Sequence, residues 1–491
     1  MNGSRGAGVL LPVGSLPGPY GFGGLGAAAH RFLQFLQAAG QSYWQVLPLG
    51  PTGFGDSPYQ AFSAFAGTPY AVDPDELYDQ GLLTNDELQE ARVPEGEDID
   101  YAALYRGRFP LLRRAFSRFD RDTPVFRDFC EKEAGWLPDY ALFMALKDRF
   151  SGLEWRRWDR DIALREPAAV ERWRRELEGE CAFWAFCQFQ FFTQWDALKT
   201  AAHERGIRFI GDIPIYVAPD SADVWAHREL FQLDAEGNPR DVAGVPPDDF
   251  SATGQLWGNP LYDWGRMEQD GFLWWRQRVQ LCARLYDVIR IDHFIGIARY
   301  YAIPAGSDTA MAGEWRPGPG KKLTDAIDQA RGQARILAED LGVLHDSVKA
   351  LLQETGYPGM RVLLFGMSGD QNNPHLPHNF PRNCVCYVGT HDNETARGFC
   401  AEHPTRDLSF MMRYLGVRRK SQLPRALVRA AYASVADTAV VQLQDLLGLG
   451  NRARMNTPST LGGNWQWRVK EEALSGELAR KLREMTALYG R

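Results

Sequence analysis

The hydrophobic positions of the chain follow two different periods, and the change between them predicts alternating elements. Short runs rich in β-branched residues are typical of buried strands, and residues 287–296, DVIRIDHFIG, are the clearest example. Apolar residues spaced three or four positions apart predict helices over 27–39, 140–150 and 182–205. Strands and helices alternate through the second half of the chain, which predicts parallel βαβ units.

Eight segments have the character of strands, and together they predict an α/β protein with a (β/α)8 TIM barrel. They are centred on Trp44, Tyr70, Phe209, Ile289, Ile336, Val362, Tyr387 and Met455. The chain is long after the second and third of these strands, so we expect large insertions there, mainly of helices and loops. The catalytic barrel is then expected to comprise residues 1–74, 201–217 and 281–491. Residues 75–200 form a helical insertion, and residues 218–280 form a loop-rich insertion that covers the active-site cleft.

The composition is that of an ordinary globular protein, with 45% hydrophobic and 24% charged residues. The net charge is −7 and no long basic run is present, which argues against a nucleic-acid partner. No stretch approaches the roughly 20 apolar residues of a membrane span. Seven scattered cysteines do not suggest a disulfide framework, so we expect reduced thiols and a cytoplasmic protein.

Two charged residues interrupt the apolar run at 287–296. Arg290 and Asp292 are two positions apart, so their side chains point to the same face of a strand. A guanidinium beside a carboxylate keeps that carboxylate ionised and oriented, which suits a nucleophile. A structural ion pair explains these two residues equally well when they are considered alone.

Three more acids, Asp212, Glu339 and Asp392, stand at the ends of predicted strands. Catalytic residues of such barrels lie at the carboxyl ends of the strands, whereas structural acids would be scattered over both ends. Several acids on one rim indicate glycoside chemistry, in which a retaining enzyme uses one carboxyl group as nucleophile and one as acid/base. Asp292 suits the first role because it has Arg290 as a neighbour. Glu339 follows an apolar run, which suits a group that must keep its proton.

A metal site is the main alternative for the histidines of this rim. His293, His391 and Asp392 are ligand types, but neighbouring residues of a strand point to opposite faces, so His–Asp and Asp–His pairs do not converge. We therefore expect neither a metal nor a cofactor.

Nine stretches follow one another over nearly the whole chain: SLPGPYGFGGLG, GPTGFGDSPYQAFSAFAGTPY, WLPDYALFMALKD, GDIPIYVAPDSADVW, VIRIDHFIG, ILAEDLG, GYPGMRVLLF, YVGTHDNET and RMNTPST. In sequence and in order they resemble the 4-α-glucanotransferases called amylomaltase or disproportionating enzyme, of the α-amylase clan. The chain departs from that pattern at Gly24, where the family usually has an acid, and at Glu394, where aspartate is common.

The resemblance implies a role for individual residues. It makes Asp292 the nucleophile, Glu339 the acid/base and Asp392 the carboxylate that stabilises the transition state. Further positions are expected to bind substrate: Arg290 and His391, which match residues contacting the sugar of the covalent intermediate, then Asp212, Tyr59 and Trp257, with Ser57 and His293 added. A second glucan site corresponds to Phe54 and Tyr101.

The resemblance also implies the reaction. The protein is expected to transfer α-1,4-glucan segments from starch or a maltooligosaccharide to the 4-OH of another glucan or of glucose, with retention of configuration. Transfer requires loops that exclude water and bind an acceptor. The loops 245–264 and 313–320 are candidates, with the rings of Phe250, Trp257 and Trp315 as sugar platforms. Two alternatives stay open from the residues alone: an α-1,4-glucan hydrolase and a non-catalytic glucan-binding barrel.

Overall fold

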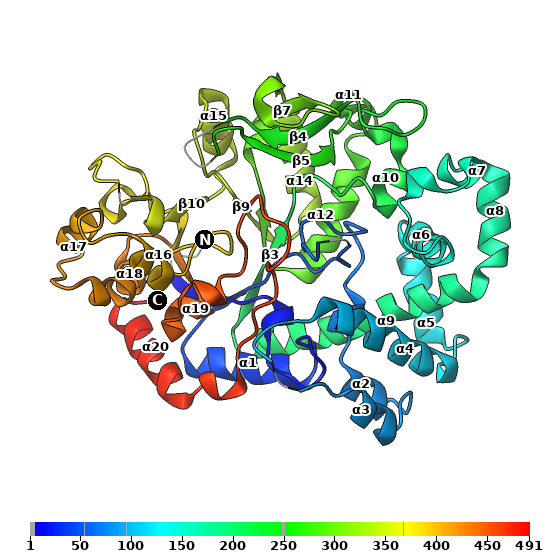
Figure 1. The fold of residues 1–491 in the computed structure, drawn as a ribbon, viewed down its shortest axis with the longest axis horizontal. Coiled ribbons are helices and arrows are strands. Elements are labelled where there is room, and N and C mark those ends of the chain that lie inside the picture. The colour runs from blue at the N-terminus through cyan, green and yellow to red at the C-terminus, as the bar shows by residue number, and fades with distance from the viewer. Residues whose placement is uncertain (1–4, 54, 95, 248–250, 367) are drawn as a thin grey trace.

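A parallel barrel forms the centre of the computed structural model, which describes residues 5–53, 55–94, 96–247, 251–366 and 368–491 (Figure 1). Within these residues eight parallel strands pair in the order β10-β11-β12-β1-β2-β3-β6-β9. Their bounds are β1 Gly6–Leu10, β2 Tyr43–Gln45, β3 Arg208–Ile213, β6 Val288–Ile291, β9 Arg335–Ala338, β10 Gly359–Val362, β11 Cys384–Tyr387 and β12 Thr438–Gln442.

The barrel closes between the two end strands of this order. The amide of Ala338, at the end of β9, donates a hydrogen bond of 2.9 Å to the carbonyl of Pro358, which directly precedes β10. All described pairings in this sheet are parallel, so the carboxyl ends of the strands lie on one rim. The predicted (β/α)8 class is confirmed.

Two of the eight predicted strands are wrong, and two real ones escape the sequence analysis. Tyr70 lies in a 3-10 turn, Pro69–Ala71, and Met455 lies in no strand. The missed strands are β1 and β12, which pair with each other from opposite ends of the chain. Both are fully buried, but β1 reads GAGVL, with little β-branched character, and β12 stands among helical patterns. Pairing with distant neighbours decides their conformation.

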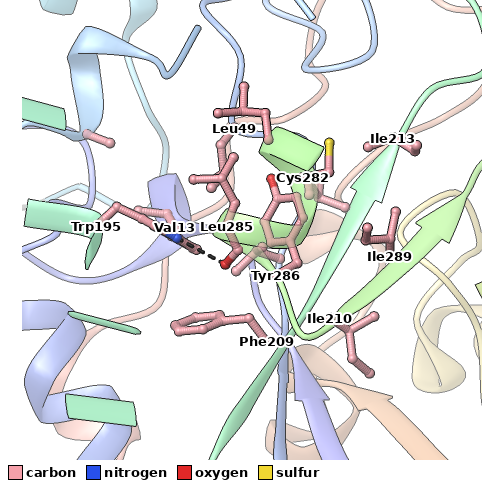
Figure 2. Packing of buried hydrophobic residues seen from close by; sticks show 14 of the residues in the cluster. Val13, Leu49, Trp195, Phe209, Ile210, Ile213, Cys282, Leu285, Tyr286 and Ile289 are labelled. Atoms are coloured by element: carbon pink, nitrogen blue, oxygen red, sulfur yellow. Dashed lines mark hydrogen bonds between the residues drawn. The ribbon is translucent and has the colours of Figure 1, made fainter. Parts of the chain in front are cut away.

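Helices surround the barrel. They are α1 (Ala27–Ala38), α12 (Leu273–Leu285), α13 (Ile295–Ala298), α14 (Lys321–Ala330), α15 (Asp346–Thr355), α16 (Ala396–Glu402), α17 (Ser409–Tyr414), α18 (Leu423–Ala433), α19 (Leu443–Leu447) and α20 (Gly476–Leu488). Figure 2 shows part of the core: Phe209 of β3 lies against Trp195, and the indole N–H of Trp195 donates to the carbonyl of Leu285 of α12 at 3.1 Å.

A helical segment separates β2 from β3 and lies to one side of the barrel (Figure 1). Its helices are α2 (Pro74–Asp79), α3 (Asn85–Ala91), α4 (Tyr101–Arg118), α5 (Pro124–Lys132), α6 (Leu137–Arg149), α7 (Arg160–Ala163), α8 (Pro167–Glu176) and α9 (Glu178–Glu204). The long helix α9 packs on α6 and is buried on most faces of its first half. None of the described helices, α9 included, is long and apolar enough to cross a membrane.

A second sheet lies beside the barrel (Figure 1). It is antiparallel, in the order β5-β4-β7-β8, with β4 Asp241–Val245, β5 Gln255–Pro260, β7 Arg299–Pro304 and β8 Glu314–Pro317. The short helices α10 (Ala222–Ala226) and α11 (Trp264–Gln269) flank it in the chain. The sequence pattern predicts loops over most of these strands. Gly244 and Gly258 interrupt β4 and β5, and the pairing of these two strands shifts register between Val242 and Gly244.

Candidate active site

The carboxyl ends of three neighbouring barrel strands bring three acids together. Asp212 is the penultimate residue of β3, and Asp292 and Glu339 directly follow β6 and β9. These strands are adjacent in the sheet, with Asp212 paired to Arg290 and Ile291 paired to Ala338. Asp292 and Glu339 therefore leave their strands at the same level of the barrel. We call this edge, with Asp392 from the loop after β11, the carboxylate rim.

Arg290 holds one side of the carboxylate rim. Its Nη1 lies 2.5 Å from Asp212 Oδ2 and 2.9 Å from Asp292 Oδ1. The guanidinium is only 3% exposed. Burial would lower the pKa of Arg290, but the two carboxylates raise it well above its usual value, so the cation is permanent. The same-face pair that the sequence predicts is present, and Asp212 joins it; Arg290 and Asp212 are buried, whereas Asp292 is partly exposed.

Backbone amides hold the other side of the rim. The N–H of His293 donates to Glu339 Oε2 at 2.8 Å, and the N–H of Leu341 donates to Glu339 Oε1 at 2.7 Å. His293 adopts a positive φ of 51°, a strained conformation that brings its amide to this carboxyl group.

The two carboxyl groups beside each other titrate differently. Burial and the charge of Asp292 raise the pKa of Glu339 to about 8. Burial also raises the pKa of Asp292, but the Arg290 guanidinium opposes it, and the value rises only to about 6. At neutral pH the arrangement therefore favours an ionised Asp292 beside a protonated Glu339. This is the pair of states that a retaining glycosyl transfer needs in its first step.

An aromatic pair, Tyr59 and His391, connects Asp392, the fourth acid of the rim, to Asp212. The hydroxyl of Tyr59 donates to Asp212 Oδ2 at 2.7 Å and lies 2.8 Å from His391 Nε2. The rings of Tyr59 and His391 stack at 5.2 Å, and His391 Nε2 lies 3.3 Å from Asp392 Oδ2. Burial would raise the pKa of Asp392, but His391 and a hydrogen bond from Asn456 outweigh it and lower the value to about 2. Asp392 is thus ionised over the working range.

Trp257 of β5 meets the rim from the second sheet. Its ring lies edge-to-face on His293, with centroids 4.8 Å apart. Burial lowers the pKa of His293 to about 4, so the imidazole is neutral. Its Nε2 is buried and has no hydrogen-bond partner within the described parts of the chain, and it is therefore available to a hydroxyl group of a ligand.

The structure does not bring every predicted residue to the rim. Ser57 caps its own turn, accepting from the amide of Tyr59 at 3.3 Å. Tyr101, at the start of α4, donates its hydroxyl proton to the carbonyl of Trp465 at 2.9 Å rather than facing a catalytic acid. Trp315 on β8 lies under the guanidinium of Arg299, at 4.2 Å. Phe54 and Phe250 lie outside the described residues.

Two residues of the rim are missing from the predicted set. Asn456 Nδ2 donates to Asp392 Oδ1 at 2.6 Å, and Arg454 Nη2 donates to the carbonyl of Asp392 at 2.7 Å. Their only signal in the sequence is their place in the RMNTPST stretch. Arg454 and Asn456 lie 62 and 64 positions from Asp392, and contacts over such separations leave no periodic pattern. In the described residues no group of three or more His, Cys, Asp or Glu side chains is arranged to hold a metal ion.

Comparisons with known proteins match this geometry. The family model described as 4-alpha-glucanotransferase matches residues 11–474. The 4-alpha-glucanotransferase of Thermus thermophilus is 48% identical over 98% of this chain and 98% of its own length. That of Clostridium butyricum is 44% identical over 98% of this chain and 100% of its own.

Solved structures give the same result. The amylomaltase from Streptococcus agalactiae, in complex with acarbose, superposes with a TM-score of 0.96 at 39% identity, covering 99% of each chain. The amylomaltase from Corynebacterium glutamicum shares the fold, with a TM-score of 0.83 at 18% identity, over 99% of this chain and 75% of its own.

Proposed function

Because this chain belongs to the 4-alpha-glucanotransferase family, which transfers segments of α-1,4-glucan from one chain to another, we propose that the carboxylate rim is the catalytic site of that transfer. Asp292 is the nucleophile, Glu339 the acid/base and Asp392 the carboxylate that stabilises the transition state. One observation carries this proposal: Arg290 Nη1 contacts Asp292 Oδ1, whereas the described hydrogen bonds to the two oxygens of Glu339 come from backbone N–H groups.

In the first step, a carboxylate oxygen of Asp292 attacks the anomeric carbon of the donor. The bond from that carbon to the glycosidic oxygen breaks, and the proton of Glu339 moves to the leaving oxygen. A β-glucosyl ester on Asp292 results. Arg290 supports this step because it keeps Asp292 ionised and restricts its orientation.

In the second step, the 4-OH of an acceptor glucan attacks the same carbon. Glu339, now ionised, takes the hydroxyl proton, the new glycosidic bond forms and the ester bond to Asp292 breaks. Two inversions give net retention of the α configuration. Asp392, which is held ionised by His391 and Asn456, stabilises the positive charge of both transition states.

Substrate binding uses the remaining predicted residues. We place Arg290, His391, Asp212, Tyr59 and His293 around the sugar that reacts. Asp212 Oδ1, His293 Nε2 and His391 Nδ1 support this placement, because each is buried and lacks a hydrogen-bond partner among the described residues. Ser57 and Trp257 extend the site, and Phe54 with Tyr101 forms the proposed second glucan site.

The segment 218–280 covers the cleft and favours transfer over hydrolysis. The contact of Trp257 with His293 supports this role, since it places a residue of the second sheet against the carboxylate rim. A cover that excludes water leaves the acceptor sugar as the main competitor for the intermediate. In the same proposal, residues 75–200 form a helical insertion. The catalytic barrel consists of residues 1–74, 201–217 and 281–491.

The protein is proposed to act in the cytoplasm on maltooligosaccharides, amylose and starch-like glucans, without a cofactor. The seven cysteines, all of them free thiols, support a reducing compartment. Cell fractionation with an antibody against the chain tests the location, and recovery in the periplasm or medium would contradict it.

Incubation with maltotriose tests the reaction. We expect glucose together with a ladder of longer glucans, and neither product from Asp292→Asn. Glucose and maltose without longer products would identify a hydrolase instead, and unchanged maltotriose would identify a binding protein.

A further inference from the structure

Trp465 has a backbone conformation that bulky residues rarely adopt. Its φ is 63°, in the left-handed region, and its side chain is buried, with only 7% exposed. Gly462 and Gly463, just before it, also have positive φ, but they lack a Cβ and pay no steric penalty. A buried aromatic residue keeps such a conformation only where its surroundings impose it, and residues of this kind cluster at functional sites.

Hydrogen bonds from two distant segments impose this conformation. The N–H of Trp465 donates to the carbonyl of Met455 at 2.7 Å, and its own carbonyl accepts from the Tyr101 hydroxyl at 2.9 Å. The neighbouring carbonyl of Gln466 accepts from the amide of Ile99 at 2.7 Å. The start of helix α4 is therefore tied directly to the backbone of Trp465.

The ring of Trp465 faces the carboxylate rim. Its centroid lies 5.7 Å from that of Tyr59 and 5.9 Å from that of His391, with interplanar angles of 41° in both cases. Tyr59 and His391 stack on each other at 5.2 Å. Their polar atoms contact Asp212 and Asp392, so a displacement of the three-ring cluster would move the groups that hold both carboxylates.

We propose that Trp465 is a positioning residue for glucan transfer, and that the Tyr101 hydroxyl keeps it in place. The ring supports the Tyr59–His391 stack, and the stack holds Asp392 and Asp212 in register. Tyr101, Met455 and Trp465 also line one pocket of about 60 Å³. This inference rests on the proposed role of the carboxylate rim.

Trp465→Asn tests the ring without adding backbone strain. Asparagine tolerates the left-handed region better than tryptophan, so the variant removes the ring while it relieves the backbone. We expect kcat for maltotriose disproportionation to fall about tenfold or more, because small misplacements of catalytic groups are costly. KM should change by less than about threefold, and Trp465→Phe, which keeps a ring against His391, should recover most of kcat. A kcat within about twofold of the parent enzyme for Trp465→Asn would overturn the inference.

Tyr101→Phe tests the hydroxyl bond in a variant that keeps every other atom. Its kcat should fall about two- to fivefold, the size expected for one lost hydrogen bond. Tyr105→Phe is the matched control, since Tyr105 lies one turn further along α4 and is 58% exposed, and its kcat should equal that of the parent. In the Trp465→Asn background, Tyr101→Phe should have no further effect, because the bond acts through the ring. An independent, additive loss would mean that Tyr101 acts by another route and would contradict the proposal.

Asp292→Asn, measured alongside, distinguishes a failure of the carboxylate-rim assignment from a failure of the positioning role. If Asp292→Asn keeps transfer activity, the assignment of the carboxylate rim fails. If Asp292→Asn is inactive while the Trp465 and Tyr101 variants equal the parent in kcat, only the positioning role fails.

Discussion

Asp292 and Glu339 are carboxyl groups at the ends of neighbouring strands, yet the protein holds them in opposite ways. On the β3–β6 side, a buried guanidinium lies against Asp292 and Asp212. On the β9 side, Glu339 receives two backbone N–H groups and no described cation. Burial is the largest cause of the raised pKa of both groups. The next cause at Asp292 is the Arg290 cation, which opposes the rise, whereas the next cause at Glu339 is the charge of Asp292, which adds to it, and Arg290 opposes the rise there with a smaller effect.

The partner rather than the residue type therefore sets the protonation state. A cation in contact lowers the free energy of the charged form, whereas an adjacent anion in a buried site raises it. Arg290 favours the ionised form of Asp292, and the charge of Asp292 is in turn one of the causes that raise the pKa of Glu339, although Arg290 itself opposes that rise. The pair has to be understood as one unit that titrates in two steps.

Removal of the nucleophile should have the largest effect. Asp292→Asn keeps the size of the side chain but cannot form the ester, so we expect transfer to fall at least ~10³-fold. Initial rates of glucose release from maltotriose measure it, with circular dichroism as the control for folding. A variant that keeps most of its activity would show that another group attacks the anomeric carbon.

Glu339→Gln should remove only the proposed acid/base group. The amide cannot protonate a leaving glucan, so turnover of maltotriose should fall about 10²-fold or more. A glucosyl fluoride donor needs no protonation, so the first step should survive, and the glucosyl ester on Asp292 should accumulate because deglycosylation still lacks its base. Intact-protein mass spectrometry detects that adduct. Its absence under these conditions would count against the division of roles.

The pH dependence should sharpen the contrast between the two groups. Activity requires ionised Asp292, whose pKa is raised to about 6, and protonated Glu339, whose pKa is raised to about 8. kcat/KM should therefore fall about tenfold per pH unit below about pH 6, where Asp292 gains a proton, and likewise above about pH 8, where Glu339 loses one. Initial rates across pH 4–10 in constant ionic strength measure this profile. A flat rate up to pH 10 would exclude Glu339 as the acid.

Trp257→Ala should have the smallest effect and tests the cover over both groups. Loss of a sugar platform should weaken glucan binding by about 1 kcal/mol. The ratio of reducing ends released to glucosyl units transferred should rise, because water needs no platform and an acceptor sugar does. Hydrolysis, transfer and thermal unfolding are measured on one preparation. An unchanged ratio in a destabilised variant would mean that Trp257 only braces β5.

Several elements of the barrel follow from local pattern, and two do not. β3, β6, β9 and β11 are buried β-branched or apolar runs, so these strands are visible in the sequence. Asp212, Asp292 and Glu339 stand where the first three runs end, whereas Asp392 lies in the loop after β11. β1, GAGVL, lacks this pattern, and β12, TAVVQ, has β-branched residues but stands among helical patterns; the two strands pair with each other across more than 400 positions. The segment at Tyr70 predicts a strand, but Tyr70 is buried in a 3-10 turn, against Phe22 and Phe109.

The sequence by itself indicated the family, through the resemblance of its nine stretches. It also indicated the barrel class and the four acids, because alternating strands and helices predict a parallel barrel whose functional residues lie at the carboxyl ends of its strands. Only the tertiary structure decided how each acid is held. The separate protonation of Asp292 and Glu339 depends on burial and on which charges lie within a few ångströms. The supports of Asp392 depend on contacts between segments far apart in the chain, Tyr59 with His391 and Asn456 with Asp392. Burial and long-range contact are properties of the folded chain, and no local pattern encodes them.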